Sequence, residues 1–251
     1  MTKIVLIGAG HLAFHFYKQF IKLRKVNLIQ WYNRSLEKID FAQSEVEVTS
    51  RLSELKVADL YLICVSDDAI ESISKKIKTQ GLIAHCAGSV PLRWLKGSSR
   101  KAVFYPLQTF TKDRDLSFNR HTFCIETTHT KDRDLLNDLA QTLGGIPHEC
   151  SSEKRAMIHM IAVLMNNFGN HLLHLGSVFS KKHQIPLEIF YPLIKETYQK
   201  AIENGPENSQ SGPAIRHDQK TIDQHLDFLS DSDIKKLYLT LTTSIQKIHE
   251  Q

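Results

Sequence analysis

A glycine-rich segment near the start of the chain constrains the fold more than any other feature. It reads Gly-Ala-Gly-His-Leu-Ala at residues 8–13, directly after the apolar run Lys3–Ile7 and before an amphipathic stretch. A strand, a GxGxxA segment and a helix in this order indicate a dinucleotide-binding unit. Gly8 permits the tight turn, Gly10 lets the backbone approach a pyrophosphate, and Ala13 lets the helix pack closely on the strand.

The helix that follows offers a binding site for phosphates. Its first turn, at His11 and Leu12, presents backbone N–H groups that have no acceptor within the helix, together with the positive end of the helix dipole. Both features favour a bound pyrophosphate. The alternative is a glycine-rich turn that arises by chance.

The end of the second predicted strand, Asn27–Trp31, indicates which dinucleotide binds. Enzymes that use NAD usually carry an acidic residue at this point for the ribose 2′-hydroxyl. This chain has Asn33, Arg34 and Ser35 instead. A carboxylate would repel a 2′-phosphate, whereas a guanidinium and a hydroxyl bind it. We therefore predict NADP as the cofactor; the alternative is that Arg34 is an ordinary exposed residue of a turn.

Two more strand ends are predicted to contact the cofactor. Val65, Ser66 and Asp67 end the fourth strand, where the nicotinamide ribose lies in this topology. Asp67 is also suited to cap the next helix, and the two roles are compatible. Gly88 and Ser89 follow the fifth strand and are predicted to contact cofactor or substrate.

Short apolar runs alternate with helical patterns up to about residue 150. This alternation predicts right-handed βαβ crossovers and an α/β fold with a doubly wound, mostly parallel Rossmann sheet. The expected strands are Lys3–Ile7, Asn27–Trp31, Val46–Val48, Leu60–Val65, Leu82–Cys86, Ala102–Tyr105 and Thr122–Glu126, and the expected helices are His11–Arg24, Asp68–Lys78 and Lys131–Leu143. We predict a dinucleotide-binding domain over residues 1–150.

Residues 151–251 are predicted to form an all-helical domain that serves the substrate and dimerisation. The expected helices are Ser151–Lys182, Pro186–Ile202, Asp218–Leu229 and Asp231–His249, and the stretch Asn204–His217 is an expected loop. Ser151 suits an N-cap. From Ala156 to Met165 the first helix is apolar almost all round, which predicts that it is buried. We expect this helix to pack against a second subunit in a homodimer.

Two polar residues on this apolar helix are candidate catalytic groups. His159 and Asn166 are seven residues apart, so they share a helix face two turns apart. With a substrate as their partner, His159 would donate a proton and Asn166 would polarise the reacting group. The alternative is an interior His–Asn pair satisfied within the protein. His171 and His174 have the spacing of half a metal site, but no acidic ligand is near in sequence, so no metal is expected.

Two residues outside this helix are candidate substrate ligands. Gln108 follows the sixth strand, at the sheet edge where open α/β sheets bind ligands. Arg216 lies in the expected loop and is suited to bind a substrate carboxylate with two hydrogen bonds. The alternative for Arg216 is an ion pair with Asp218 that stabilises the start of the next helix. Asp218 itself suits an N-cap.

Composition argues against several other functions. The net charge of +5 resides within residues 1–150, which suits a small polyanionic ligand. The sequence has no basic stripe interleaved with aromatic residues, so nucleic-acid binding is not expected. No apolar stretch reaches 18 residues, so no membrane span is expected. The cysteines form no CxxC pair and predict free core thiols, Cys86 included, in a reducing cytoplasm. They are Cys64, Cys86, Cys124 and Cys150.

Several segments resemble known reductases. Three segments resemble pyrroline-5-carboxylate reductases and 6-phosphogluconate-dehydrogenase-like reductases. They are Ile4–Ala13, Asn33–Ser35 and Ala58–Ile70. Five further segments resemble a bacterial family of NADP oxidoreductases, which pairs a Rossmann-like domain with a helical C-terminal domain of unknown function. These segments are Tyr105–Phe110, His159–Asn166, Ser211–Asp218, Thr221-Ile222 and His225-Leu226. The resemblance spans nearly the whole chain. It implies the fold and the cofactor type but not the substrate.

Two positions depart from the patterns of these families. The catalytic Lys of related hydroxyacid dehydrogenases would fall at Val163, three residues before Asn166, and is absent. The Arg-Gly-Asp pattern of the loop is Arg216-His217-Asp218 in this chain. We hypothesise hydride transfer between NADPH and a small carbonyl or imine. The alternative is a non-catalytic NADP-binding sensor or scaffold with no working proton donor.

Overall fold

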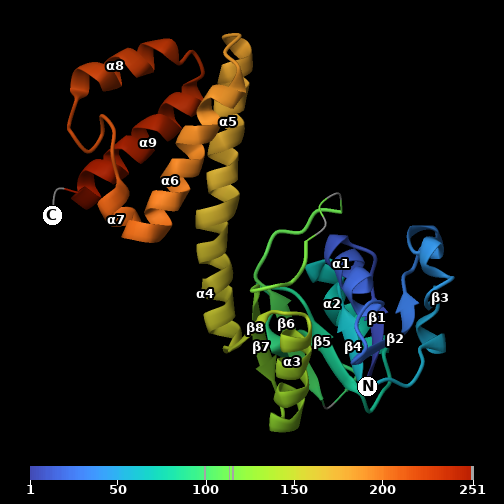
Figure 1. Cartoon of the computed structure of the whole chain (residues 1–251). Coiled ribbons are helices and arrows are strands. Elements are labelled where there is room, and N and C mark those ends of the chain that lie inside the picture. Colours follow the sequence, from blue (N-terminus) through green and yellow to red (C-terminus); the bar gives the residue numbers. More distant parts are fainter. Residues whose placement is uncertain (99, 113, 115, 250–251) are drawn as a thin grey trace. The chain divides into compact units, whose positions relative to one another are not determined.

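The computed structural model describes residues 1–98, 100–112, 114 and 116–249 (Figure 1). Contacts between backbone positions divide the chain into two compact units, Met1–His171 and Leu172–Gln251. The first contains the sheet and the beginning of a long helical run, and the second is helical. The predicted domain boundary after residue 150 falls inside the first unit and stays a prediction.

The first unit is built on an eight-stranded sheet in the order β3-β2-β1-β4-β5-β6-β7-β8. All neighbouring strands run parallel except β6 and β7. The strands are β1 (Thr2–Ile7), β2 (Val26–Tyr32), β3 (Glu47–Thr49), β4 (Leu60–Ile63), β5 (Leu82–His85), β6 (Lys101–Pro106), β7 (Thr122–Thr127) and β8 (Ile146–Glu149). The chain reverses direction along the sheet between β1 and β4, which is where such folds bind their ligands. The predicted doubly wound Rossmann sheet is confirmed.

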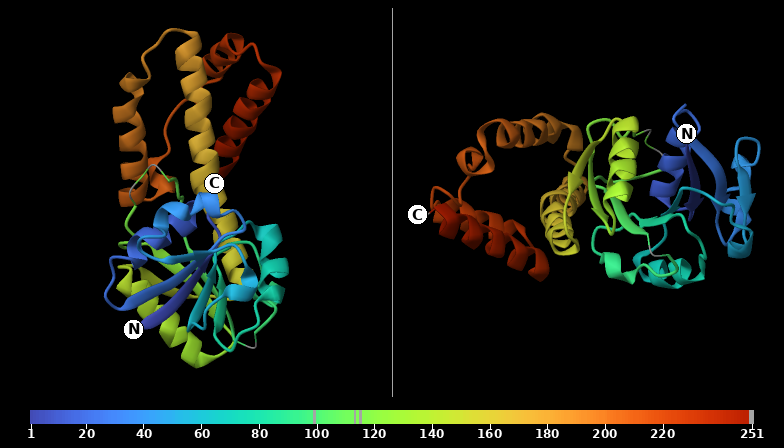
Figure 2. Two further views of the ribbon diagram at one scale, coloured as in Figure 1. Left: turned by 90° about the vertical axis from the view of Figure 1, so that its right-hand side faces the viewer. Right: turned by 90° about the horizontal axis from the view of Figure 1, so that it is seen from below.

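Helices cover both faces of this sheet (Figure 2). On one face, α1 (His11–Phe20) and α3 (Thr130–Thr142) pack on a core that includes Phe16, Phe104 and Leu136. On the other face, α2 (Ile70–Lys76) packs through Ile70 and Ile77 on a second core. Alternate residues of each strand supply the two cores because successive side chains point to opposite faces. The first helix ends four residues earlier than the sequence predicted.

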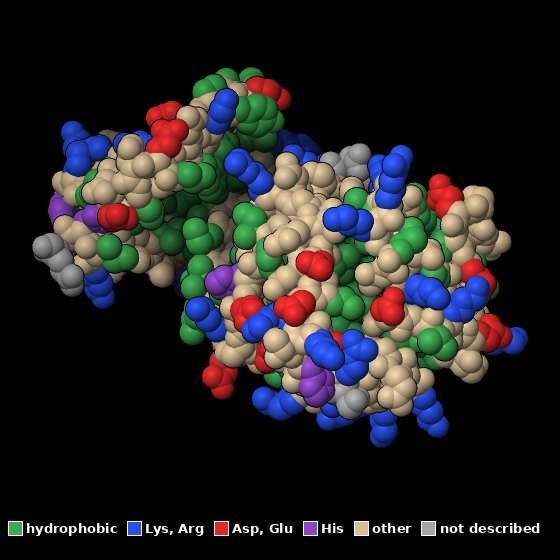
Figure 3. Space-filling model, turned by 60° about the horizontal axis from the view of Figure 1, so that its bottom comes forward, with side chains coloured by type: hydrophobic (Ala, Val, Ile, Leu, Met, Phe, Trp, Pro, Cys, Tyr) green, Lys and Arg blue, Asp and Glu red, His purple; other side chains and the backbone are tan. Residues whose placement is uncertain are grey.

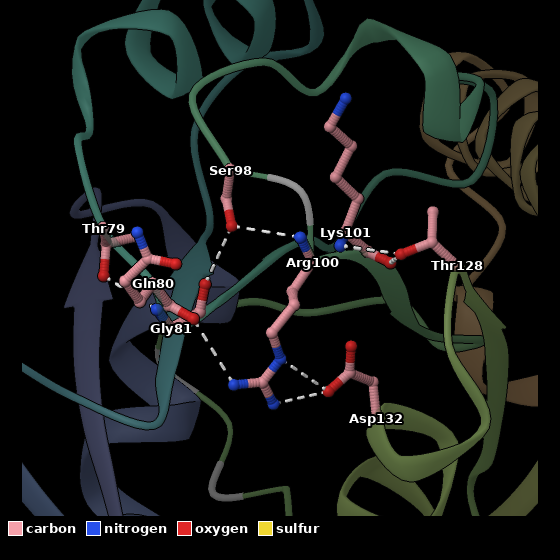
Figure 4. A network of polar contacts seen from close by, with 8 residues as sticks. All are labelled: Thr79, Gln80, Gly81, Ser98, Arg100, Lys101, Thr128 and Asp132. Atoms are coloured by element: carbon pink, nitrogen blue, oxygen red, sulfur yellow. Dashed lines mark hydrogen bonds and ion pairs between the residues drawn. The ribbon is translucent and has the colours of Figure 1, made fainter.

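The far edge of the sheet differs from the sequence prediction. β8 was not expected, and it pairs parallel to β7 after the crossover through α3. Its short sequence Ile-Pro-His-Glu carries little strand signal, so the pairing is decided by β7. Arg100, just before β6, ties this edge together because its guanidinium donates from Nε to Oδ1 of the buried Asp132 on α3 at 3.0 Å (Figure 4).

The helical region begins as one continuous run of three segments. Predicted as a single helix, it comprises α4 (Ser152–Ala162), a π-helical segment (Val163–Phe168) and α5 (Gly169–Lys182). Ser151 is its N-cap, as predicted, and its hydroxyl accepts from the Lys154 amide at 3.2 Å. The remaining helices are α6 (Tyr191–Asn204), α7 (Pro206–Ser209), α8 (Gln219–Phe228) and α9 (Ser232–His249). The short α7 lies where only loop was expected.

The apolar face of α4 and the π-helical segment is open within this chain. Met157 is 55% exposed, Leu164 53% and Met165 72%. Burial of this stretch was expected from its composition, and the single chain does not provide it. Green apolar side chains lie open on the surface of the molecule in Figure 3. No helix among the described residues is long and apolar enough to span a membrane.

Candidate functional site

The candidate site is a pocket of about 720 Å³ at the carboxyl ends of β1, β2 and β4. The sequence-predicted residues that line it come from three turns of the chain: Gly8, Gly10, His11, Leu12, Asn33, Arg34, Val65, Ser66 and Asp67. Ala13, Ser35, Gly88 and Ser89 belong to the same turns or adjoin them but are not part of the lining. Residues far apart in sequence therefore meet in one cavity, as the strand order requires.

Gly8 is required by the shape of the first turn. Its φ is +107°, a region that favours glycine, and a Cβ here would lie 2.2 Å from the carbonyl oxygen of Cys64. The turn is also held by the Trp31 indole, which donates from Nε1 to the Gly8 carbonyl at 2.7 Å. Helix α1 starts directly after Gly10 with no side-chain cap and no acidic residue in its first turn. The helix N-terminus therefore faces the pocket with no acidic side chain in its own first turn.

The turn after β2 supplies positive charge to the pocket. Asn33 shapes it by donating from Nδ2 to the Ser35 carbonyl at 2.8 Å. Arg34 is exposed at the pocket wall, and Lys38 and Lys76 join it in the lining. Sequence reasoning missed both lysines. Lys38 could have been found from its position four residues after Arg34, but Lys76 on α2 reaches the pocket only through the fold.

Asp67 and Ser89 meet at the end of the pocket beside β4 and β5. The Ser89 hydroxyl donates to Asp67 Oδ2 at 2.6 Å. The predicted capping role of Asp67 is wrong because Ser66 is at the N-cap position of this turn and no side chain caps it. Nearby, Cys64 and Cys86 line the pocket with their sulfur atoms 3.6 Å apart, and burial raises the pKa of the Cys86 thiol. A buried thiol with a raised pKa is typical of a core cysteine, which is the role that the sequence predicts for Cys86.

One candidate catalytic residue contacts the end of β6, and the other contacts the segment that follows it. His159 Nδ1 lies 3.2 Å from the hydroxyl of Tyr105, and their rings meet edge to face. Asn166 Nδ2 donates to the Thr109 hydroxyl at 2.7 Å. His159 and Asn166 are therefore not paired with one another. Two of the segments that carry the family resemblance thus lie against each other.

Tyr105 and Gly88 shape the immediate surroundings of His159. Burial raises the pKa of Tyr105 to about 12, with the charge of Cys124 adding to this effect, so the phenol keeps its proton. A Cβ on Gly88 would lie 2.7 Å from His159 Nδ1 and 2.9 Å from Tyr105 Cζ. Gly88 directly follows Ala87, which lines the pocket. The glycine thus lets the Tyr105–His159 pair approach the end of the cavity. Tyr105 was not singled out from the sequence.

The two candidate substrate ligands, Gln108 and Arg216, lie in different units of the chain. Gln108 Nε2 lies 3.1 Å from His121 Nε2, and its Oε1 accepts from the Thr109 amide at 2.8 Å, so local contacts occupy it. Arg216 lies exposed in the second unit, in the turn before α8. Asp218 caps α8 as predicted, accepting from the Thr221 amide at 3.1 Å. Hydrogen bonds from Thr221 and, secondarily, the charge of Arg216 lower the pKa of Asp218.

A buried charge anchors α4 to the sheet next to the site. Arg155 is fully buried, forms an ion pair with Glu126 of β7, and donates from Nη2 to the Val90 carbonyl at 2.6 Å. His85, at the end of β5, is also fully buried. Desolvation, and then the charge of Arg155, lower the pKa of His85 to about 3. His85 is therefore neutral at physiological pH, and the sequence had not marked Arg155 as part of the core.

Comparisons with known proteins agree with this architecture. The sequence profile of a domain of unknown function, DUF2520, matches residues 121–245. The chain is similar to a Bacteroides fragilis protein named a putative NADP oxidoreductase, with 36% identity, a TM-score of 0.88 and coverage of 98% of each chain. No curated protein matches the sequence.

More distant solved structures share the fold. Pyrroline-5-carboxylate reductase from Streptococcus pyogenes has 15% identity and a TM-score of 0.64, covering 100% of this chain and 99% of that one. The Plasmodium falciparum pyrroline carboxylate reductase, solved with NADP bound, has 12% identity and a TM-score of 0.63, covering 99% and 97%. At these identities the similarity extends to the fold alone.

Proposed function

The chain belongs to the family of the Bacteroides fragilis protein, in which a Rossmann-like domain precedes DUF2520, and we propose that it is an NADP-dependent oxidoreductase. Its reaction is hydride transfer between NADPH and a small carbonyl or imine. The observation that carries the proposal is one pocket that combines the Gly8 turn with a basic wall at Arg34 and extends to Ala87, whose neighbour Gly88 packs against His159.

The pocket fits the cofactor on two grounds. Gly8 forms the tight turn, where a Cβ would collide with the Cys64 carbonyl, and the uncapped start of α1 that follows favours phosphate. Arg34 and Lys38 provide charges for a 2′-phosphate where an NAD enzyme would carry a carboxylate. NADPH supplies the hydride when bound, and the protein orients it.

The substrate roles follow from the polar groups beside the pocket. His159 donates a proton to the reduced heteroatom, Asn166 polarises the acceptor, and Gln108 binds the substrate. In the second unit, Arg216 is suited to a substrate carboxylate. The local partners of Asn166 and Gln108 must be exchanged for substrate in this scheme.

Calorimetric titration tests the cofactor assignment. Arg34→Ala should weaken NADPH binding about 10- to 150-fold, because a charge-assisted hydrogen bond to phosphate contributes about 1.5–3 kcal/mol. NADH binding should change little, since NADH has no 2′-phosphate. Arg24→Ala removes an exposed arginine between α1 and β2 and is the matched control. Equal affinity of the wild type for both cofactors would contradict the assignment.

A substrate screen tests the catalytic part. Purified protein is given NADPH with keto acids, aldehydes or cyclic imines, and NADPH oxidation is followed. His159→Ala and Asn166→Ala should lower turnover about 10²- to 10⁴-fold and leave NADPH binding nearly unchanged. NADPH binding without oxidation across the screen would favour the non-catalytic sensor or scaffold.

A second copy of the chain is our proposal for what covers the apolar face of α4 and the π-helical segment. Met157, Leu164 and Met165 are each more than half exposed on this short stretch, and neighbouring exposed apolar side chains mark interaction surfaces. Light scattering at micromolar concentration should give a dimer, and Leu164→Glu should give a monomer. Val57→Glu, at an exposed apolar residue in the sheet unit, is the control. A wild-type monomer would contradict the proposal.

The cytoplasm is the proposed location. All four cysteines are buried and free, although Cys64 and Cys86 lie close together. Free neighbouring thiols are typical of reducing compartments.

A further inference from the structure

We infer that Tyr105 is a positioning residue that fixes the tautomer of His159, so that the ring proton is on Nε2 and Nδ1 accepts from the phenol. This inference deepens the proposed function and rests on it for its catalytic meaning. The tautomer itself is a property of the protein alone. It can be measured without a substrate or cofactor.

The geometry places the two groups within hydrogen-bond reach and holds them there. Tyr105 Oη and His159 Nδ1 are 3.2 Å apart, and the ring centroids are 6.0 Å apart at an interplanar angle of 74°. The backbone of Gly88 packs directly against both rings, because any Cβ at that position would collide with them. Tyr105 is on the rigid strand β6 and His159 on the helix α4, so neither backbone is a mobile loop.

The direction of the hydrogen bond determines the tautomer. A phenol has one proton, and a neutral imidazole has one nitrogen that donates and one that accepts. Burial keeps the Tyr105 proton on its oxygen. Among the described residues, His159 Nδ1 is the hydrogen-bond partner found for that hydroxyl. Of the two arrangements that this contact allows, we infer the one in which the phenol donates to Nδ1, which leaves the imidazole proton on Nε2.

Charged groups around the pair support a neutral phenol. The Asp67 carboxylate disfavours ionisation of Tyr105, whereas the buried Arg155 favours it, and desolvation outweighs both. Asp67 is in turn held by the Ser89 hydroxyl. The element on which His159 lies also carries Arg155, whose charge is paired with Glu126. The phenol thus remains a donor across the physiological pH range.

A fixed tautomer matters for the proposed proton donation. A histidine that exchanges between two tautomers presents its proton at a given nitrogen only part of the time. With Nδ1 occupied as an acceptor, Nε2–H is the hydrogen-bond donor that a substrate heteroatom meets, which orients and polarises that heteroatom. Tyr105 acts through His159 and makes no contact of its own with the hydride acceptor in this scheme.

The chain contains a matched control pair in its second unit. The hydroxyl of Tyr238 lies 2.8 Å from His225 Nδ1, with ring centroids 5.9 Å apart at 86°. This pair repeats the geometry of Tyr105 and His159 in helices α8 and α9. Tyr238→Phe therefore removes the same kind of hydrogen bond in the other unit of the chain.

The experiment is ¹⁵N NMR of the full chain labelled at histidine, with the His159 signals assigned by their loss in His159→Gln. The wild type should show His159 as the Nε2–H tautomer. Tyr105→Phe should shift it severalfold toward a mixture with Nδ1–H, and Tyr238→Phe should leave it unchanged while altering His225. An Nδ1–H tautomer in the wild type, or an unchanged ratio in Tyr105→Phe, would overturn the inference.

A second variant covers the case in which Tyr105→Phe does not fold. Gly88→Ala keeps the phenol but forces it away from the imidazole. It should therefore also shift His159 from the Nε2–H tautomer toward a mixture with Nδ1–H. An unchanged ratio in a folded Gly88→Ala protein would count against the inference. A fixed Nε2–H tautomer together with no NADPH oxidation would contradict the proposed function and leave the tautomer inference intact. Failure of the inference and failure of the proposed function are therefore distinguishable.

Discussion

The sheet region, residues 1–150, buries its apolar side chains in a different way from the helical region that follows it. In the first, two continuous cores enclose residues such as Ile4, Phe104 and Ile63 on the two faces of the sheet. In the second, Ala214 and Ile222 are the buried hydrophobic residues among those described. The sheet region completes its own core. The helical region leaves apolar faces for which we propose a second chain.

The same contrast holds for buried polar groups. The sheet and the start of α4 enclose a charged pair, Arg155 with Glu126, and a neutral His85. Groups of this kind need fixed partners because an unpaired buried charge is costly. The buried polar side chains described in the helical unit, Ser180 and Thr242, are instead uncharged, and the charged Asp218 is only half-buried. The sheet region is therefore expected to be the more sensitive of the two to single substitutions.

The largest expected effect compares one core residue with one helix-face residue. Phe104→Ala should lower the free energy of unfolding by about 3–5 kcal/mol, because it opens a cavity between fully buried rings. Leu164→Ala should cost under about 1 kcal/mol in dilute monomer, since that side chain is 53% exposed. Urea denaturation measures both. A concentration-dependent loss in Leu164→Ala would show that a second chain covers this face.

An intermediate effect is expected from pH. The folded chain holds the pKa of His85 at about 3, against 6.5 for the free side chain. Between these values the unfolded chain binds a proton that the folded chain excludes, so stability falls as pH falls below about 6.5, by up to about 1.4 kcal/mol per pH unit. Above that pH the group contributes no slope.

The variant that isolates this effect is His85→Asn, whose side chain can still accept from the Ala87 amide as His85 Nδ1 does. Its stability deficit relative to wild type should shrink by about 2 kcal/mol between pH 7 and pH 5. His148→Asn, at an exposed histidine on β8, is the control. Parallel pH profiles for wild type and His85→Asn would contradict the assignment of a neutral buried His85.

The smallest expected effect lies in the helical unit. His217 has a φ of +52°, in the left-handed region that favours glycine, at the position where the related family pattern has glycine. His217→Gly should raise the free energy of unfolding by up to about 1 kcal/mol by relieving this strain. Thermal unfolding would measure the change. Destabilisation would instead mean that the exposed His217 side chain makes a contact worth more than the strain.

The sequence predicted the fold best where the signal is local. The order of strands and helices up to α3 followed from periodicity, and the N-caps Ser151 and Asp218 from residue type alone. It failed where partners are distant. The strand β8 forms because β7 is beside it, and the apolar run after Ala156 was expected to be buried although the single chain leaves it open.

For the candidate site, the sequence by itself determined the phosphate end of the pocket. The Gly8 turn and the basic turn at Arg34 are set by residues adjacent in the chain, whose backbone preferences act over a few bonds. Only the tertiary structure decided the other end. Tyr105 meets His159 across 54 positions of sequence, because the order of the strands and the docking of α4 bring them together. Side-chain partners at such separations depend on the packing of whole elements, which no short pattern encodes.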